Sequence, residues 1–292
     1  MQITSNHDKL THGQFLLREP VGKRSSKTKE LSYRPYRREA TGPFLVNYMV
    51  TPWRNSAGKH FATRPVNPNP TSITTMNESL LPSRFLFRFA APCMYRKDIW
   101  GDDGVKLPAA HRLAALEELE GGTSPADVRA AWNETGLALW VQVKGKSHAP
   151  RCHEARLDSS DGVRVWIDTR DTHNVHRASR FCHEFIFLPA GAGTRGRDPV
   201  AEQVLIHRAR ENAKLVRGGT LGVRSEVRKD GYVLSGFIPA AALAGYEPAD
   251  HPRLGFQYAL VDHDLGVQTF SVGAEFPYET DPSVWGTLEL VH

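Results

Sequence analysis

Two short segments of this 292-residue chain alternate apolar and polar residues with the period of a β-strand. Side chains of a strand point to opposite faces at every second residue. In residues 136–144 one face is aliphatic, with Leu137, Leu139, Val141 and Val143. That core face is complete without Trp140, which lies on the other face beside Gln142 and Lys144. The pattern therefore predicts a strand that carries an outward-facing indole.

Residues 162–168 repeat this arrangement. Val163, Val165 and Ile167 form the inward face, while Trp166 lies between Arg164 and Asp168 on the polar face. An indole flanked by hydrogen-bonding side chains suits a flat, hydroxylated ligand, and a sugar ring is the obvious candidate. The sequence thus predicts a carbohydrate site in which the two indoles are platforms. The predicted hydrogen-bonding partners are Arg164, Asp168 and Gln142.

Two alternatives accompany this prediction. A covering loop could bury both indoles as a second layer of core. Arg177 and Arg180 could bind hydroxyls or carboxylates of an acidic sugar, because guanidinium offers five donors in a fixed fork. They could equally anchor their loop through backbone carbonyls, which we favour slightly.

The remaining pattern predicts an all-β fold: a single antiparallel β-sandwich with few short helices. Residues 229–231 read Lys-Asp-Gly between two alternating runs, a strong hairpin signal. Residues 239–245 predict one or two helical turns, and residues 111–120 fit either a short helix or an irregular strand. Further strands are predicted at 84–89 (with Phe85, Phe87 and Phe89 on one face), 181–188, 204–209, 221–228, 232–238, 254–262 and 284–291.

Charge divides the chain into two parts. Residues 1–75 hold 12 Lys and Arg against 4 Asp and Glu, which leaves 25 against 28 in residues 76–292. The first part has seven prolines and no hydrophobic period, so we predict a disordered basic leader before one domain over 76–292. Met76 is a candidate for the true start. Because the basic excess lies in the leader, no nucleic-acid partner is expected.

The expected compartment is the cytoplasm. No apolar segment follows a charged start, as a signal peptide requires, and no apolar run reaches the length of a membrane span. Cys93, Cys152 and Cys182 make an odd count without a CxxC motif, which favours reduced thiols.

Three other patterns carry weaker signals. Residues 191–196 spell GxGxxG before Asp198 and Pro199, but strand–helix alternation is missing, so a loop between strands is expected. Aspartates in 158–161 and 262–264 could bind calcium, although turn formation explains them equally well. A metal-dependent enzyme would require a cluster of potential ligands to converge, although their spacing matches no standard finger. These ligands are Cys152, His176, Cys182 and His183.

Three segments, in order, resemble motifs of the family 9 carbohydrate-binding modules and their DOMON-like relatives. They are residues 131–141, residues 160–168, and residues 231–239 together with 285–288. The resemblance implies a jelly-roll-like sandwich that binds glycan ends through an aromatic clamp, often with structural calcium. Arg164 replaces an acidic residue of the family's pattern, and Ser235 replaces a glutamate.

The function expected from these observations is non-catalytic carbohydrate binding, with calcium as the one cofactor to consider. The alternative is an intracellular interaction or scaffold protein that keeps the fold without sugar binding. A flat apolar patch would favour the scaffold, and a polar-lined groove would favour the carbohydrate.

Overall fold

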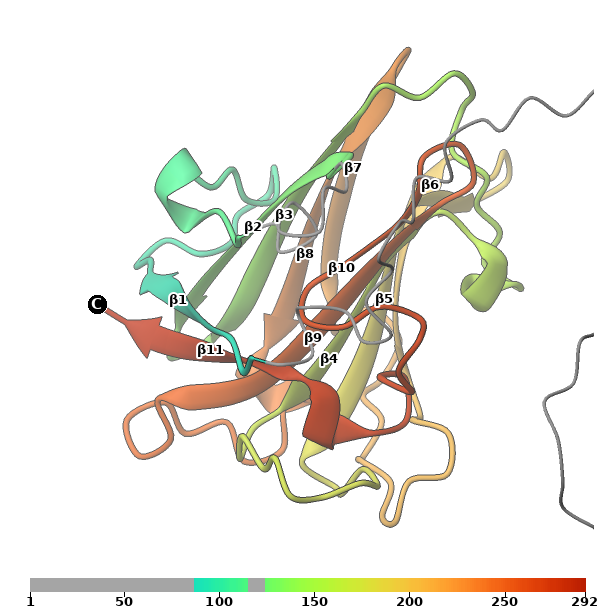
Figure 1. The fold of residues 1–292 in the computed structure, drawn as a ribbon. Coiled ribbons are helices and arrows are strands. Elements are labelled where there is room, and N and C mark those ends of the chain that lie inside the picture. The colour runs from blue at the N-terminus through green and yellow to red at the C-terminus, as the bar shows by residue number, and fades with distance from the viewer. Residues whose placement is uncertain (1–86, 115–123) are drawn as a thin grey trace, which may run out of the picture. The chain divides into compact units, whose positions relative to one another are not determined.

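The computed structural model describes residues 87–114 and 124–292 (Figure 1). The predictions for the leader over 1–75, for Met76 and for Phe85 lie outside the described residues. The predicted element at 111–120 is described only in its first residues, where a 3-10 turn spans Ala109–His111. No helix in the described ranges has the length and apolar character to cross a membrane.

The described part of the chain is nearly all β. Its short helices are 3-10 turns at Ala109–His111, Leu157–Ser159, Ala240–Ala242 and Pro282–Val284. Its strands are β1 (Ala90–Tyr95), β2 (Ala126–Asn133), β3 (Gly136–Lys144), β4 (Gly162–Asp168), β5 (Cys182–Ala192), β6 (Asp198–Val204), β7 (Gly222–Arg228), β8 (Gly231–Pro239), β9 (Arg253–Asp262), β10 (Gly266–Thr269) and β11 (Gly286–Val291). The predicted all-β class with few short helices is confirmed.

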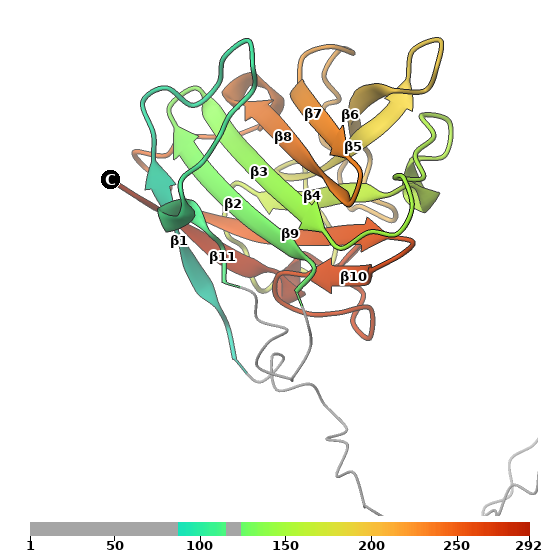
Figure 2. The same cartoon turned by 90° about the horizontal axis from the view of Figure 1, so that it is seen from above.

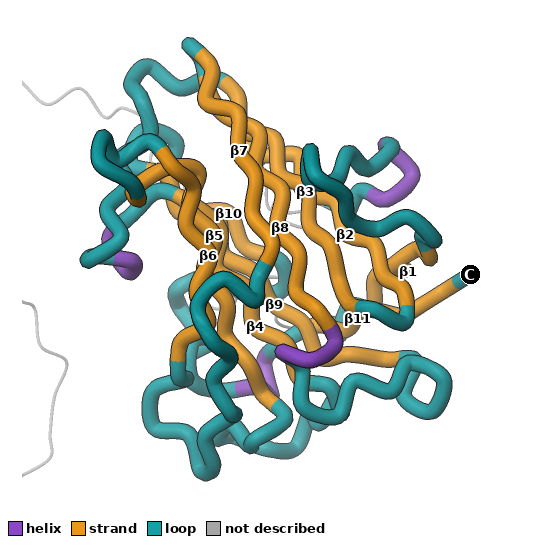
Figure 3. The backbone as a smooth tube through the Cα atoms, turned by 180° about the vertical axis from the view of Figure 1, so that it is seen from behind, coloured by secondary structure: helices purple, strands orange, loops and turns teal. Residues whose placement is uncertain are grey.

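These strands form one continuous sheet that is nearly closed into a barrel. The strand order is β6-β5-β4-β9-β11-β1-β2-β3-β8-β7, with β10 paired to β9. Strands β2, β3, β8 and β7 lie side by side in one half, and β4, β5, β6 and β9 lie in the other (Figures 2 and 3).

The prediction of an antiparallel sandwich needs one correction. β1 pairs in parallel with both β11 and β2 and thereby joins the two halves. The long segment between β1 and β2 makes this pairing feasible, since parallel neighbours need a crossover rather than a tight turn. All other pairs among the described strands are antiparallel.

The main core lies between the halves. Inward residues of β3, such as Leu139 and Val141, share it with Val165 of β4 and Phe187 of β5. A side chain at Gly236 of β8 would place its Cβ 2.9 Å from the Phe187 ring. The glycine therefore lets the facing halves approach closely, and the inward faces are those that the alternation predicted.

Two predicted strands are wrong in the residues that the structure describes. Residues 87–89 precede β1 instead of forming a strand, and Phe87 is exposed. The strand predicted at 204–209 instead ends at residue 204 as β6. Residues 191–196 lie at the hairpin between β5 and β6, as expected for a loop between strands, and Asp198 opens a strand rather than a helix.

Sequence inspection missed the first part of β2. Its inward residues Ala126, Val128 and Ala130 are buried. Two of these three are alanines, so the alternation with Asp127 and Arg129 is a weak hydrophobic signal.

Candidate functional site

A four-strand half of the sheet presents a regular grid of side chains on its outer face. In one row, Arg129 of β2 is paired with Trp140 of β3, Trp140 with Ser235 of β8, and Ser235 with Arg224 of β7. The strand alternation places Trp140 outward, as the sequence predicted. This row crosses the whole half-sheet.

The neighbouring row is more polar. It runs from Asp127 through Gln142 and Val233 to Glu226. Together with residues 102–106, every residue of the two rows except Asp127 lines an open pocket of about 850 Å³. No described residue is hydrogen-bonded to the Gln142 side-chain amide, which lines the same pocket as Trp140.

Trp140 is not an exposed platform. Only 6% of the residue is accessible, and the Arg129 guanidinium lies 4.4 Å from the ring centroid. Arg129 is itself fixed by Asp127 and by the carbonyl oxygen of Leu107, 2.6 Å from Nη1. The segment before β2 covers the indole with apolar side chains of Ile99, Val105 and Leu107. The expectation of an exposed ring is therefore wrong, because a covering segment makes the indole part of an outer core layer.

Trp166 is covered even more completely, on the other half of the sheet. It is 0% accessible and packs edge-on against Tyr278, with ring centroids 5.3 Å apart. Val272 and Trp285 belong to the same buried cluster. The residues preceding β11 thus bury the outer face of β4.

Arg164 lies above Trp166 in a network of carboxylates. Its Nη2 is 2.5 Å from Glu184 Oε1 and 3.5 Å from Asp158, and its Nη1 is 3.2 Å from Glu279. These four side chains line a second pocket of about 1040 Å³. Burial raises the pKa of Glu184 although Arg164 opposes this shift, so the carboxylate depends on its guanidinium partner.

The predicted single site is thus divided. Strands β3 and β4 are separated in the sheet by β9, β11, β1 and β2. Trp140 and Gln142 line the first pocket, whereas Arg164 lines the second. The expectation that both indoles share one groove is wrong.

The other predicted ligand residues have structural partners. Asp168 is buried and accepts hydrogen bonds from the backbone N–H groups of Arg170 and Thr172, which fixes the turn after β4. Arg177 Nε donates to the carbonyl oxygen of Arg208 at 3.0 Å, so it anchors the loop. Arg180 is exposed, 3.5 Å from Glu211.

The candidate metal ligands do not converge. Cys152 Sγ donates to the Asp161 carbonyl at 3.2 Å, Cys182 contacts Ser179, and His183 Nε2 accepts from the Ala244 N–H. Burial raises the pKa of Cys152 and of Cys182 to about 11, so both are protonated thiols at neutral pH in the metal-free chain. Within 87–114 and 124–292 no group of three or more such ligands can hold a metal ion. The convergence that a metal-dependent enzyme would require is therefore not found among these four residues.

His176, Asp281 and Ser283 form a cluster that sequence inspection missed. Its composition is that of a hydrolase triad, but His176 Nδ1 contacts both Asp281 Oδ2 and Ser283 Oγ, each at 3.1 Å. A triad histidine must use one nitrogen for the carboxylate and the other for the hydroxyl. The cluster therefore lacks the geometry for proton relay.

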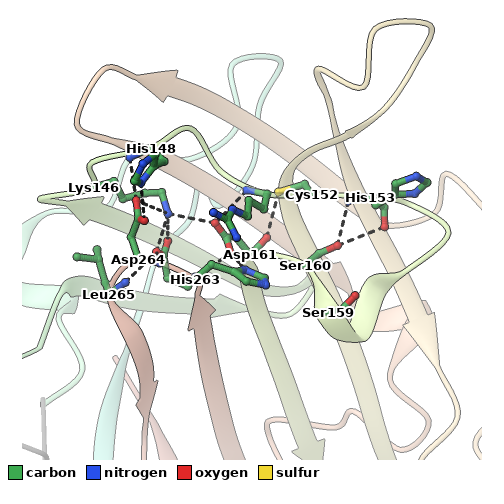
Figure 4. A network of polar contacts seen from close by, with 12 residues as sticks. Lys146, His148, Cys152, His153, Ser159, Ser160, Asp161, His263, Asp264 and Leu265 are labelled. Atoms are coloured by element: carbon green, nitrogen blue, oxygen red, sulfur yellow. Dashed lines mark hydrogen bonds and ion pairs between the residues drawn. The ribbon is translucent and has the colours of Figure 1, made fainter. Parts of the chain in front are cut away.

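The predicted calcium ligands meet in part, but around an amine (Figure 4). Lys146 Nζ is 3.1 Å from Asp161 Oδ2, 2.5 Å from Asp262 Oδ1 and 3.8 Å from Asp264 Oδ2. Calcium needs six to eight oxygen ligands at about 2.3–2.6 Å. Because the ammonium takes the centre of the cluster, the residues present do not fit a calcium ion. Asp158 lies elsewhere, beside Arg164.

Comparisons with known proteins give similarity at the level of structure. No family model matches the sequence, and no curated protein is similar to it. A family 9 carbohydrate-binding module from Caldicellulosiruptor kristjanssonii, in complex with cellotriose, is 11% identical. It covers 70% of this chain and 94% of its own, with a TM-score of 0.47. For a structure from the same organism and family, in complex with glucose, identity is 12%, the coverages are 69% and 95%, and the TM-score is 0.44. At this sequence identity and TM-score, the residues that could bind a ligand must be identified from the structure of this chain itself.

Proposed function

We propose that this chain contains a non-catalytic carbohydrate-binding domain whose site is the pocket on the outer face of β2, β3, β8 and β7. The observation that carries the proposal is the lining of that pocket. Hydrogen-bond donors and acceptors surround about 850 Å³ of open space above a partly apolar floor. A polar-lined groove favours a sugar ligand over the flat apolar surface of a scaffold.

The pocket's donors and acceptors match a polyol. The Gln142 amide offers two donors and an acceptor to a hydroxylated ring. Arg224 uses Nε and Nη1 for the carbonyl oxygens of Asp102 and Val223, which leaves Nη2 for a ligand. Asp103 supplies carboxylate oxygens, and so does Glu226, although Arg228 already donates to both of its oxygens. Sugar hydroxyls both donate and accept, so this mixture supports recognition by hydrogen bonds.

Trp140 has a different role from the sugar-stacking platform that the sequence predicted. Its ring lies under Arg129 and contributes to the floor of the pocket, rather than stacking on a sugar. Recognition mainly by hydrogen bonds in an open pocket implies modest affinity. We expect a Kd of roughly 10 μM to 1 mM, about −7 to −4 kcal/mol.

The test is a glycan-array screen of the full chain beside three variants. Gln142→Ala and Arg224→Ala remove proposed ligand contacts, and both should lose the wild-type signal. Arg180→Ala is the matched control, because it removes an exposed arginine outside the pocket lining. It should bind as wild type does.

Two outcomes would contradict the proposal. Folded wild-type protein that binds no glycan would favour the interaction or scaffold alternative. Binding that survives Gln142→Ala and Arg224→Ala but disappears in Arg180→Ala would place the site elsewhere. Circular dichroism of each variant separates lost binding from lost folding.

A further inference from the structure

Three distant chain segments meet at a buried ammonium group. Lys146, which follows β3, points toward Asp161, which precedes β4 (Figure 4). The third residue, Asp262, ends β9. All three residues are buried, with Asp161 fully inaccessible. Lys146 Nζ lies 2.5 and 2.6 Å from the two oxygens of Asp262, and 3.1 Å from Asp161. The amine is therefore held by carboxylates of two other segments.

The carboxylates are fixed by donors on their other sides. Asp161 Oδ2 accepts from the Arg151 N–H at 3.0 Å, while its Oδ1 accepts from the backbone and the ring of His263. Asp264 Oδ2 accepts from the N–H groups of Ser147 and His148. These bonds orient the remaining lone pairs toward Lys146, so the oxygen positions do not depend on the lysine alone.

The resulting cage resembles a cation site in its chemistry. Four carboxylate oxygens from three aspartates lie within 3.8 Å of Lys146 Nζ. Hard divalent cations such as Ca²⁺ prefer such all-oxygen surroundings. Burial lowers the pKa of Lys146, but its hydrogen bonds to Asp262 and Asp161 outweigh that effect and raise it. The amine is thus charged at neutral pH.

We propose that the Lys146 ammonium is a built-in cation that replaces a divalent metal ion at this junction. The wild-type junction needs no metal, and removal of the lysine side chain converts its oxygen cage into a calcium site. The junction is connected to the second pocket, which is not the pocket of the proposed function. Residues 154–159, in the segment between Lys146 and Asp161, line the pocket beside Arg164. Because the Lys146 ammonium is part of the chain, it holds this wall of the pocket in place whether or not metal ions are present.

Thermal unfolding of the full chain tests the proposal, with millimolar CaCl₂ or with EDTA. The wild-type Tm should be the same in both. Lys146→Ala should lower the Tm in EDTA by about 10 °C, because it leaves buried carboxylates without their cation. Calcium should restore much of this loss, and calorimetric titration should show one bound Ca²⁺ per chain.

Lys144→Ala is the matched control. This lysine ends β3, is exposed and makes no ion pair with a described residue. The variant should keep the wild-type Tm and show no response to calcium. A Lys146→Ala protein without a calcium response beyond that of Lys144→Ala would overturn the proposal. So would a wild-type protein that is stabilised by calcium or destabilised by EDTA.

A second measurement covers the case in which Lys146→Ala is insoluble. The variant is then refolded from urea in CaCl₂ or in EDTA, and the yield of folded protein is compared. A severalfold higher yield in calcium supports the proposal, and equal yields contradict it.

Discussion

At the residue scale, His183 shows how burial sets a charge state. The sequence offers His183 as a potential metal ligand, and the structure makes it a hydrogen-bonded core histidine instead. The ring is buried, and Nε2 accepts the Ala244 N–H at 3.1 Å. Burial lowers the pKa of His183 from 6.5 to about 4. The imidazole is therefore neutral in the folded protein at physiological pH.

This shift predicts a pH-dependent stability. Between pH 6.5 and 4 the unfolded chain binds a proton at His183 that the folded chain does not, so stability falls as the pH falls. The expected loss over this window is at most about 3 kcal/mol. Urea unfolding of wild type and His183→Gln at several pH values measures it. The difference in unfolding free energy between them should change across the window, and a constant difference would refute the assignment.

At the element scale, local signals located strands well where alternation was strong. Strands β3 and β4 have the predicted bounds, and the Asp-Gly turn joins β7 to β8. The start of β2 was missed because two of its three inward residues are alanines, whose small side chains give only a weak hydrophobic signal. β1 was misplaced because Phe87 and Phe89, the described aromatic residues before it, alternate without either being buried. Pattern strength, rather than strand length, decided which elements could be predicted.

The β2–β3 hairpin gives a prediction at this scale. Gly136 has a φ of 149°, and a Cβ there would lie 2.2 Å from the Ile238 carbonyl oxygen of β8. Gly136→Ala should therefore lower the unfolding free energy by roughly 2–4 kcal/mol, through steric strain against backbone. Gly218→Ala is the control, because its Cβ meets no atom within 4 Å. Its effect should stay within about 0.5 kcal/mol. Equal unfolding midpoints in urea for the two variants would contradict this prediction.

At the scale of the whole molecule, the two tryptophans belong to separate outer layers. Trp140 packs in a cluster on the half formed by β2, β3, β8 and β7. Trp166 packs in a cluster on the other half, and the two clusters have no residue in common. The molecule therefore has two covered outer faces in addition to its central core.

Because the two clusters are separate, the effects of substituting Trp140 and Trp166 on the unfolding free energy should be additive. Trp140→Phe and Trp166→Phe should each reduce the unfolding free energy by about 1–3 kcal/mol. The double variant should lose the sum to within about 0.5 kcal/mol, because residues without shared partners do not couple. Chemical denaturation of the wild type, the two single variants and the double variant completes this double-mutant cycle. A coupling free energy well above that value would show that the two faces communicate.

The sequence alone determined which way the side chains point. Alternation assigned Leu139, Val165 and their neighbours to the core, and it placed Trp140 and Trp166 on the opposite faces. These assignments hold because the direction of a strand side chain is a local property of the backbone.

Only the tertiary structure decided what covers those outward side chains and which groups meet. The residues over Trp166 precede β11, and the Lys146–Asp262 ion pair joins positions 116 apart in sequence. Neither contact has a local signal, since both depend on how loops return across a nearly closed sheet. The same returning segments bury the two indoles and leave the pocket around Gln142 open. The candidate site therefore consists of the hydrogen-bonding groups around Gln142 rather than of the tryptophans.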